Sequence, residues 1–120
     1  MMTSKFRFQD LIIWQRSIDI SDRLLDIADA LEKQKLYRFA EQLRGAILSI
    51  SNNISEGSGS SSNIDFKDFL NYSHRSVFEV VNILIILERR KLIPSQQLNS
   101  LLDELEILSK QISSFKKSLK

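Results

Sequence analysis

Apolar residues recur at the period of an α-helix through four segments of the chain, at about residues 10–33, 36–56, 63–91 and 95–118. The fourth segment is the most regular, because its apolar residues alternate in steps of three and four, the spacing of a helix that buries one stripe. These residues are Leu98, Leu101, Leu105, Leu108, Ile112, Phe115 and Leu119. In chain order, the stripes of the other three are Leu11, Trp14, Ile18, Leu25 and Ala28, with Leu24 and Leu31 beside them; Phe39, Leu43, Ile47, Ile50 and Ile54; and Phe66, Phe69, Leu70, Val77, Val80, Leu84 and Leu87.

Residues that favour helix ends lie between these segments. Asp10 is expected to cap the first helix and Ser62 or Asn63 the third, while Pro94 and Ser95 mark the start of the fourth. Four amphipathic helices joined by short loops predict an all-α fold, an up-down-up-down antiparallel four-helix bundle. A chain of 120 residues suffices for one domain with a single core, so one domain over residues 1–120 is expected.

The third segment is apolar around its whole circumference between residues 77 and 87, where only Glu79 and Asn82 interrupt it. A helix that is apolar on every side is normally buried on every side, and a bundle helix has an outer face. We therefore expect burial against another copy of the chain, with the band Leu11 to Trp14 as a second contact. The interface predicted in this way comprises Leu11, Trp14, Phe78, Val81, Ile85 and Ile86. The alternative is that these residues are scattered exposed apolar side chains.

Composition removes several classes of function. The chain has no cysteine and a single histidine, His74, which Asn71 precedes by three residues, so the Glu-x-x-His motif of carboxylate-bridged metal bundles is missing. No metal site, cofactor or catalytic group is expected, and the chain is predicted not to be an enzyme. The N-terminus lacks a signal-peptide pattern and the most apolar run contains Glu79, which predicts a cytoplasmic protein with no membrane segment.

The formal net charge is only +2, but the topology would segregate the charges in space. One end of the bundle would gather Lys33, Lys35, Arg38, Arg89, Arg90 and Lys91, and the other Lys5, Arg7, Lys67, Lys116, Lys117 and Lys120. The first set is the candidate nucleic-acid site, since clustered cations bind phosphates. The alternative is that helix-end cations only offset macrodipoles and maintain solubility, which we favour for the C-terminal lysines.

The stretch from Ser49 to Gly57 interrupts the second helical pattern with adjacent asparagines and a glutamate. Asn53 and Glu56 are expected to bond the backbone at the helix end, with Gly57 or Gly59 in a left-handed cap. Two alternatives remain: that the polar stripe sets register at a subunit interface, or that it binds a ligand.

A salt bridge between Arg44 and Glu79 is also expected, because an antiparallel hairpin centred near residue 60 brings these two residues within reach.

Three segments together resemble the 23S rRNA-intervening-sequence proteins: FQDLIIWQRSIDI, QLRGAILSISNNISEG and FLNYSHRSVFEVVNILIIL. These are bacterial four-helix-bundle proteins, often described as ribosomal-protein-like. They belong to the same superfamily as the accessory variability determinant proteins of diversity-generating retroelements. The most specific part is the signature Ser49 to Gly57, which follows the Asp-Leu-x-x-Trp motif of Asp10 to Trp14. Asn53, Glu56 and Gly57, with Arg44 and Glu79, are assigned to the structural motif of this family.

The resemblance implies a homo-oligomer, in known cases a pentameric ring. It also implies partners, since the family includes members encoded inside rRNA genes and retroelement members that bind nucleic acid and a reverse transcriptase. This chain departs from the pattern at Ser51, where the family has a proline, and at Gly45 and Ser60, where it has basic residues. Arg75 and Ser76 stand where the family has Gly-Ser. The missing basic positions weaken the nucleic-acid role.

The leading hypothesis is a non-enzymatic homo-oligomer that binds structured RNA, or a ribosomal or reverse-transcriptase partner, through its basic bundle ends. The alternative is a protein-protein assembly or adaptor scaffold with no affinity for nucleic acid.

Overall fold

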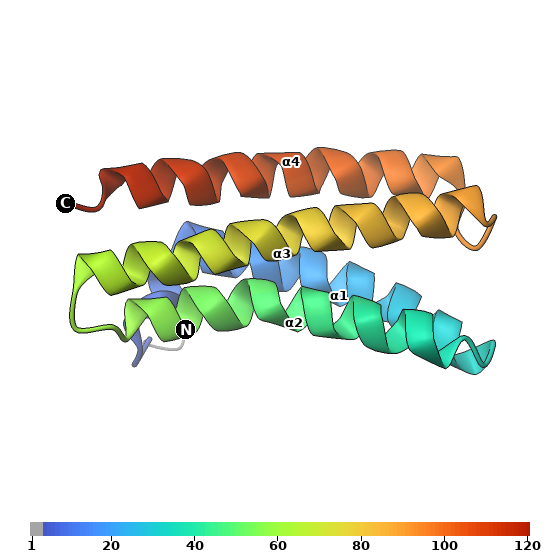
Figure 1. Ribbon diagram of the computed structural model, residues 1–120, viewed down its shortest axis with the longest axis horizontal. Helices are drawn as coiled ribbons and strands as arrows, with labels where there is room; N and C mark the ends of the chain where they lie inside the picture. The colour runs from blue at the N-terminus through green and yellow to red at the C-terminus, as the bar shows by residue number, and fades with distance from the viewer. Residues whose placement is uncertain (1–3) are drawn as a thin grey trace.

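The computed structural model describes residues 4–120, in which four antiparallel α-helices pack side by side around one core (Figure 1). The helices are α1 (Ile12–Lys33), α2 (Tyr37–Ser58), α3 (Asn63–Arg89) and α4 (Ser95–Ser118), and a single 3₁₀ turn, η1 (Arg7–Asp10), precedes them. Each helix packs against the next in the chain, and α1 also contacts α4. The predicted all-α up-down-up-down bundle is confirmed. The first three residues of the predicted domain lie outside the described range.

Two of the predicted helix starts are confirmed and one is wrong. The hydroxyl of Ser62 caps α3 by accepting a hydrogen bond from the backbone N–H of Asp65 at 3.1 Å, and α4 begins at Ser95 directly after Pro94. Asp10 does not cap α1, because it is the last residue of η1 and α1 starts only after Leu11, whose side chain makes no capping bond.

The predicted stripes of the second and fourth helices are buried apart from the half-buried Phe39, Phe115 and Leu119, but the stripe of α1 is rotated. Its buried apolar residues are Ile13, Ile20, Leu24, Ile27, Ala28 and Leu31, whereas Leu11, Trp14, Ile18 and Leu25 are only half-buried. Ser17 and Ser21 complete the buried face, and their hydroxyls donate to the carbonyls of Trp14 and Ser17 at 2.7 and 2.5 Å. A serine can occupy the core when its hydroxyl bonds a carbonyl of the preceding turn. Because serine counts as polar, the sequence pattern placed the buried stripe of α1 on the wrong residues.

The end of α2 also differs from the prediction. The helix is uninterrupted through Ser51 and Gly57 to Ser58, and Gly59 follows at φ −86°, so neither glycine forms a left-handed cap. Gly57 is instead buried against the side chains of Phe66 and Phe69 of α3. This glycine therefore serves the close approach of two helices and not a turn.

Within residues 4–120, no helix is both long enough and apolar enough to cross a membrane.

Candidate nucleic-acid interface at the basic end

Two helix connections lie at the same end of the bundle, the turn between α1 and α2 and the turn between α3 and α4 (Figure 1). The sequences that form them are alike: Leu-Glu-Lys-Gln-Lys-Leu over residues 31–36 and Leu-Glu-Arg-Arg-Lys-Leu over residues 87–92. In both, a leucine on each side packs into or against the core, and the residues between them face solvent. The bundle thus presents the same basic turn twice at one end.

The backbone of the two turns is the same as well. In the first, the N–H of Leu36 donates to the carbonyl of Leu31 at 2.9 Å, and the N–H of Lys35 donates to that of Glu32 at 2.9 Å. The second turn repeats this pair of bonds between residues 92 and 87 and between residues 91 and 88, both at 2.8 Å. This is the Schellman motif, in which the residue after the cap adopts a left-handed conformation.

Lysine occupies that left-handed position in both turns. Lys35 has φ 65° and Lys91 has φ 61°, and they are the two non-glycine residues with positive φ in the described part of the chain. Glycine is the usual residue here, because a Cβ in this conformation costs of order 1 kcal/mol. Nothing in the packing requires a lysine, since both side chains are exposed.

The structure places all the residues predicted for this end at or next to the two turns. Lys33, Lys35, Arg38, Arg89, Arg90 and Lys91 are exposed. In the range 4–120, the ion pairs involve other residues and leave these cations without a carboxylate partner. The two nearby glutamates have other contacts, because Glu32 pairs with Arg44 and Glu88 accepts a hydrogen bond from the hydroxyl of Ser95 at 2.8 Å. We refer to these six cations as the basic end.

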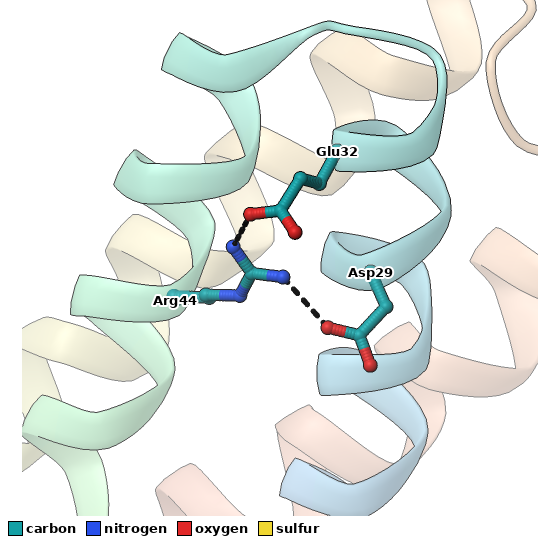
Figure 2. Close-up of polar contacts among 3 residues, drawn as sticks. All are labelled: Asp29, Glu32 and Arg44. Carbon is teal, nitrogen blue, oxygen red and sulfur yellow. Dashed lines mark hydrogen bonds and ion pairs between the residues drawn. The ribbon is translucent and has the colours of Figure 1, made fainter.

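Arg44 is not part of the basic end. Its side chain links α2 to α1. Figure 2 shows its guanidinium reaching from α2 to two carboxylates of α1, with nitrogen-oxygen distances of 2.7 Å to both Asp29 and Glu32. These hydrogen bonds, first that of Asp29, raise the pKa of the Arg44 guanidinium above its ordinary value. The predicted pair of Arg44 with Glu79 is wrong. Arg44 lies on the α1 side of α2, whereas Glu79 lines the groove between α2 and α3 beside Arg38 and Gln42.

Double-mutant cycles should reproduce this geometry. We expect coupling in the free energy of unfolding between Arg44→Ala and Asp29→Ala, because each substitution removes one partner of the same hydrogen bond. Arg44→Ala and Glu79→Ala should be additive, and this pair is the matched control. Urea unfolding followed by circular dichroism measures both cycles, and the coupling should weaken with added salt because the pair is partly exposed. Coupling to Glu79 alone would contradict the contacts seen here.

The stretch from Ser49 to Gly57 lies within α2 and is hydrogen-bonded to α3. The amide of Asn53 donates to the carbonyl of Ser49 at 2.7 Å and to its hydroxyl at 3.0 Å, and the hydroxyl of Ser76 donates to that same hydroxyl at 2.8 Å. One turn away, the buried hydroxyl of Ser73 donates to the carbonyl of Ile50 at 2.8 Å. The predicted backbone bond of Asn53 is therefore present, although it lies within the helix and not at its end.

Glu56 and Asn52 remain exposed, and the predicted backbone bond of Glu56 is wrong, because its side chain makes no hydrogen bond to any described residue. The hydrogen bonds of this stretch favour the structural interpretation of Asn53. A role for the stretch in ligand binding or in subunit register stays a prediction.

The residues predicted for a subunit interface divide into exposed and half-buried ones. Phe78, Ile85 and Ile86 of α3 are 62%, 39% and 38% exposed, and the Phe78 ring packs against that of His74 at a centroid distance of 5.1 Å. Burial lowers the pKa of His74, helped by the charge of Lys116. Val81, Leu11 and Trp14 are half-buried and pack against the core. The exposed three are not covered by the rest of the described chain, and the interface itself stays a prediction.

Fold and site together define a small helical-bundle protein with a cationic end. In the described part of the chain, no three His, Asp or Glu side chains are grouped so that they could hold a metal ion. The model of the 23S rRNA-intervening sequence protein family matches residues 9–114, and the chain belongs to this family. The resemblance seen in the sequence is confirmed.

A solved structure gives the same fold. It is the crystal structure of a protein of unknown function from the S23 ribosomal protein family of Bacteroides thetaiotaomicron VPI-5482, with a TM-score of 0.83 and 23% sequence identity. The similarity covers 89% of this chain and 100% of that one. No curated protein matches this chain.

Proposed function

We propose that this chain is a non-catalytic, homo-oligomeric RNA-binding protein that contacts the phosphates of structured RNA through its basic end. The observation that carries this proposal is the left-handed backbone conformation of a lysine in both turns. A strained backbone position persists where the surrounding structure enforces it, and such positions concentrate at functional sites. Glycine would relieve the strain at Lys35 and Lys91, so a lysine at these positions lowers the stability of the fold.

The charge of the basic end suits a phosphate backbone. Arg38, Arg89 and Arg90 carry planar guanidinium groups that can bind a phosphate through two hydrogen bonds. The lysines supply compact, mobile charges, and those cations have no ion-pair partner among residues 4–120 to be displaced on binding. A homo-oligomer would repeat this surface once per subunit, which raises the apparent affinity through avidity. The ring of five subunits implied by the family resemblance would suit this arrangement.

Membership in the 23S rRNA-intervening sequence protein family supports an RNA partner. The two positions at which this chain lacks the basic residues of the family pattern do not lie in the two turns. Gly45 is an exposed residue in the middle of α2, and Ser60 lies in the α2–α3 connection at the opposite end of the bundle. The basic end is therefore independent of the positions at which this chain departs from the pattern.

The test is fluorescence anisotropy with a labelled RNA hairpin at low and at near-physiological salt. We expect micromolar or tighter binding that weakens steeply with salt and is lost when Arg89, Arg90 and Lys91 are all replaced by alanine. Replacing Lys116, Lys117 and Lys120 by alanine removes the same charge at the other end and is the matched control, which should bind nearly as well as the unmodified protein.

A second pair of variants separates function from folding. Lys35→Gly and Lys91→Gly should each raise the free energy of unfolding by about 0.5–1 kcal/mol, because relief of the left-handed Cβ outweighs the added freedom of the unfolded chain. Both should also weaken hairpin binding. Lys35→Ala and Lys91→Ala, the matched controls, remove the charge but keep the Cβ, so they should weaken binding without the gain in stability. A more stable glycine variant with unchanged affinity would contradict the proposed role of the lysines.

The exposed apolar residues of α3 favour a second candidate, a protein-protein assembly scaffold. Failure of the hairpin to bind even at low salt would overturn the RNA proposal and leave this candidate. The self-association that both candidates share is tested separately below.

A further inference from the structure

Three aromatic rings form a continuous row at the end of the bundle opposite the basic end. The rings of Phe6 and Phe8 are nearly parallel, with an interplanar angle of 27° and centroids 6.0 Å apart. The rings of Phe8 and Trp14 continue the row in an edge-to-face contact, with centroids 5.0 Å apart and an interplanar angle of 66°. Trp14 and Phe8 are half-buried, whereas Phe6 is 64% exposed. The row thus runs from the half-buried Trp14 into solvent and ends in the exposed ring of Phe6.

The exposed ring is held on a fixed backbone. The side-chain carbonyl of Gln9 accepts hydrogen bonds from the N–H groups of Lys5 and Phe6 at 3.1 and 2.9 Å. The amide of Gln15 in α1 donates to the backbone carbonyl of Gln9 at 2.8 Å, which ties this segment to the helix. A ring that is positioned before a ligand arrives loses less conformational entropy on binding.

Two cations adjoin the aromatic residues in the sequence, and one of them, Lys5, lies beside the rings. An open hollow of about 670 Å³ lies over it, lined by Ser4, Lys5, Phe6, Phe8, Gln9, Trp14 and Gln15. Lys5 borders the hollow, and the exposed Arg7 lies 5.2 Å above the centre of the Phe66 ring, between Phe6 and Phe8 in the sequence. Lys5 and Arg7 flank Phe6 in the sequence, and Asp10 is the one carboxylate of residues 5–10. Rings alternating with cations suit a ligand with flat bases and a negative backbone.

We infer that Phe6, supported by Phe8 and Trp14, forms a stacking site for an unpaired base of single-stranded nucleic acid, with Lys5 and Arg7 contacting the adjoining phosphates. A stacked base strengthens binding by roughly ten-fold or more in such sites, largely regardless of sequence. An uncharged apolar peptide would not use the interleaved cations, and binding of anionic lipid vesicles in place of the oligonucleotide would overturn the inference. The site goes beyond the proposed function, because it lies at the other end of the bundle and contacts bases and not only phosphates.

Trp14 is the only tryptophan of the chain, so its fluorescence reports on the row directly. We expect a short oligothymidylate to quench this fluorescence with saturation, and an abasic deoxyribose-phosphate oligomer of the same length to bind roughly ten-fold more weakly or not at all. Phe6→Leu, which keeps an apolar side chain but no ring, should weaken oligothymidylate binding by roughly ten-fold. Phe6→Tyr, the matched control, keeps the ring face and should bind like the unmodified protein.

Equal binding of the abasic oligomer, or unchanged binding by Phe6→Leu, would overturn the inference. A Trp14 signal that depends on protein concentration and ignores the oligonucleotide would also overturn it, because a second copy of the chain would then cover the row. The triple alanine variant of Arg89, Arg90 and Lys91 should keep its quenching by oligothymidylate while losing the RNA hairpin. The two sites can therefore fail independently.

Discussion

Replacing Gly57 by alanine is expected to destabilise the fold by about 1–3 kcal/mol, although alanine is the better helix former. A Cβ at this position would lie 2.7 Å from the Cβ of Phe69 and 2.8 Å from Cδ1 of Phe66. The Phe69 atom is attached directly to the backbone, so relief requires α2 and α3 to move apart. That movement would also strain the hydrogen bonds by which Ser73 and Ser76 join the two helices.

Gly45→Ala is the matched control and should have the opposite sign. It changes the same residue type in the same helix, but a Cβ built at Gly45 meets no atom within 4 Å. Only the helix preference remains, and this should stabilise the protein by about 0.5–1 kcal/mol. Urea unfolding of both variants measures the difference. Stabilisation by both substitutions would mean that the close approach at Gly57 is not required by the packing of α2 and α3.

Replacing Ile85 or Ile86 by glutamate is expected to lower the particle mass in light scattering several-fold while the protein stays helical. Both side chains are more than a third exposed in the single chain, so the substitution need not disturb its core. In the proposed homo-oligomer the same carboxylate would be buried in an apolar contact without a partner, which costs several kcal/mol per interface. Circular dichroism on the same samples separates dissociation from unfolding.

Ile64→Glu is the matched control for this experiment. Ile64 lies on the same helix and is 74% exposed, but it is outside the apolar band at residues 77–87. This variant should keep the particle mass of the unmodified protein. An unchanged mass for the Ile85 and Ile86 variants would remove α3 from the proposed interface, and a single-chain mass for the unmodified protein would remove the oligomer altogether.

The location of the basic end could be predicted from the sequence, but its construction could not. Once the topology was known to alternate, Arg38 and the Arg89–Lys91 run had to lie at the same end. The left-handed conformation of Lys35 and Lys91 was missed, because glycine is the residue that normally signals it. The available signal was the repeated Leu-Glu-x-x-Lys-Leu at the end of α1 and of α3.

Contacts between helices were the least predictable feature. Arg44 was assigned to Glu79 from the register of one hairpin alone, yet its partners Asp29 and Glu32 belong to the other neighbour of α2. Sequence spacing gives the turn of the helix on which a side chain lies, but it does not give the direction in which a long, flexible side chain extends.

The sequence by itself determined the number, order and approximate bounds of the helices, because hydrophobic periodicity and breaker residues act within a few residues of each other. Only the tertiary structure decided that Ser17 and Ser21 face the core, that Gly57 allows α2 and α3 to approach, and that two lysines adopt a left-handed backbone. Each of these depends on atoms from another turn or another helix. Steric fit and hydrogen-bond satisfaction between segments are set by their final packing, and the repeated Leu-Glu-x-x-Lys-Leu is the one local signal for any of these features.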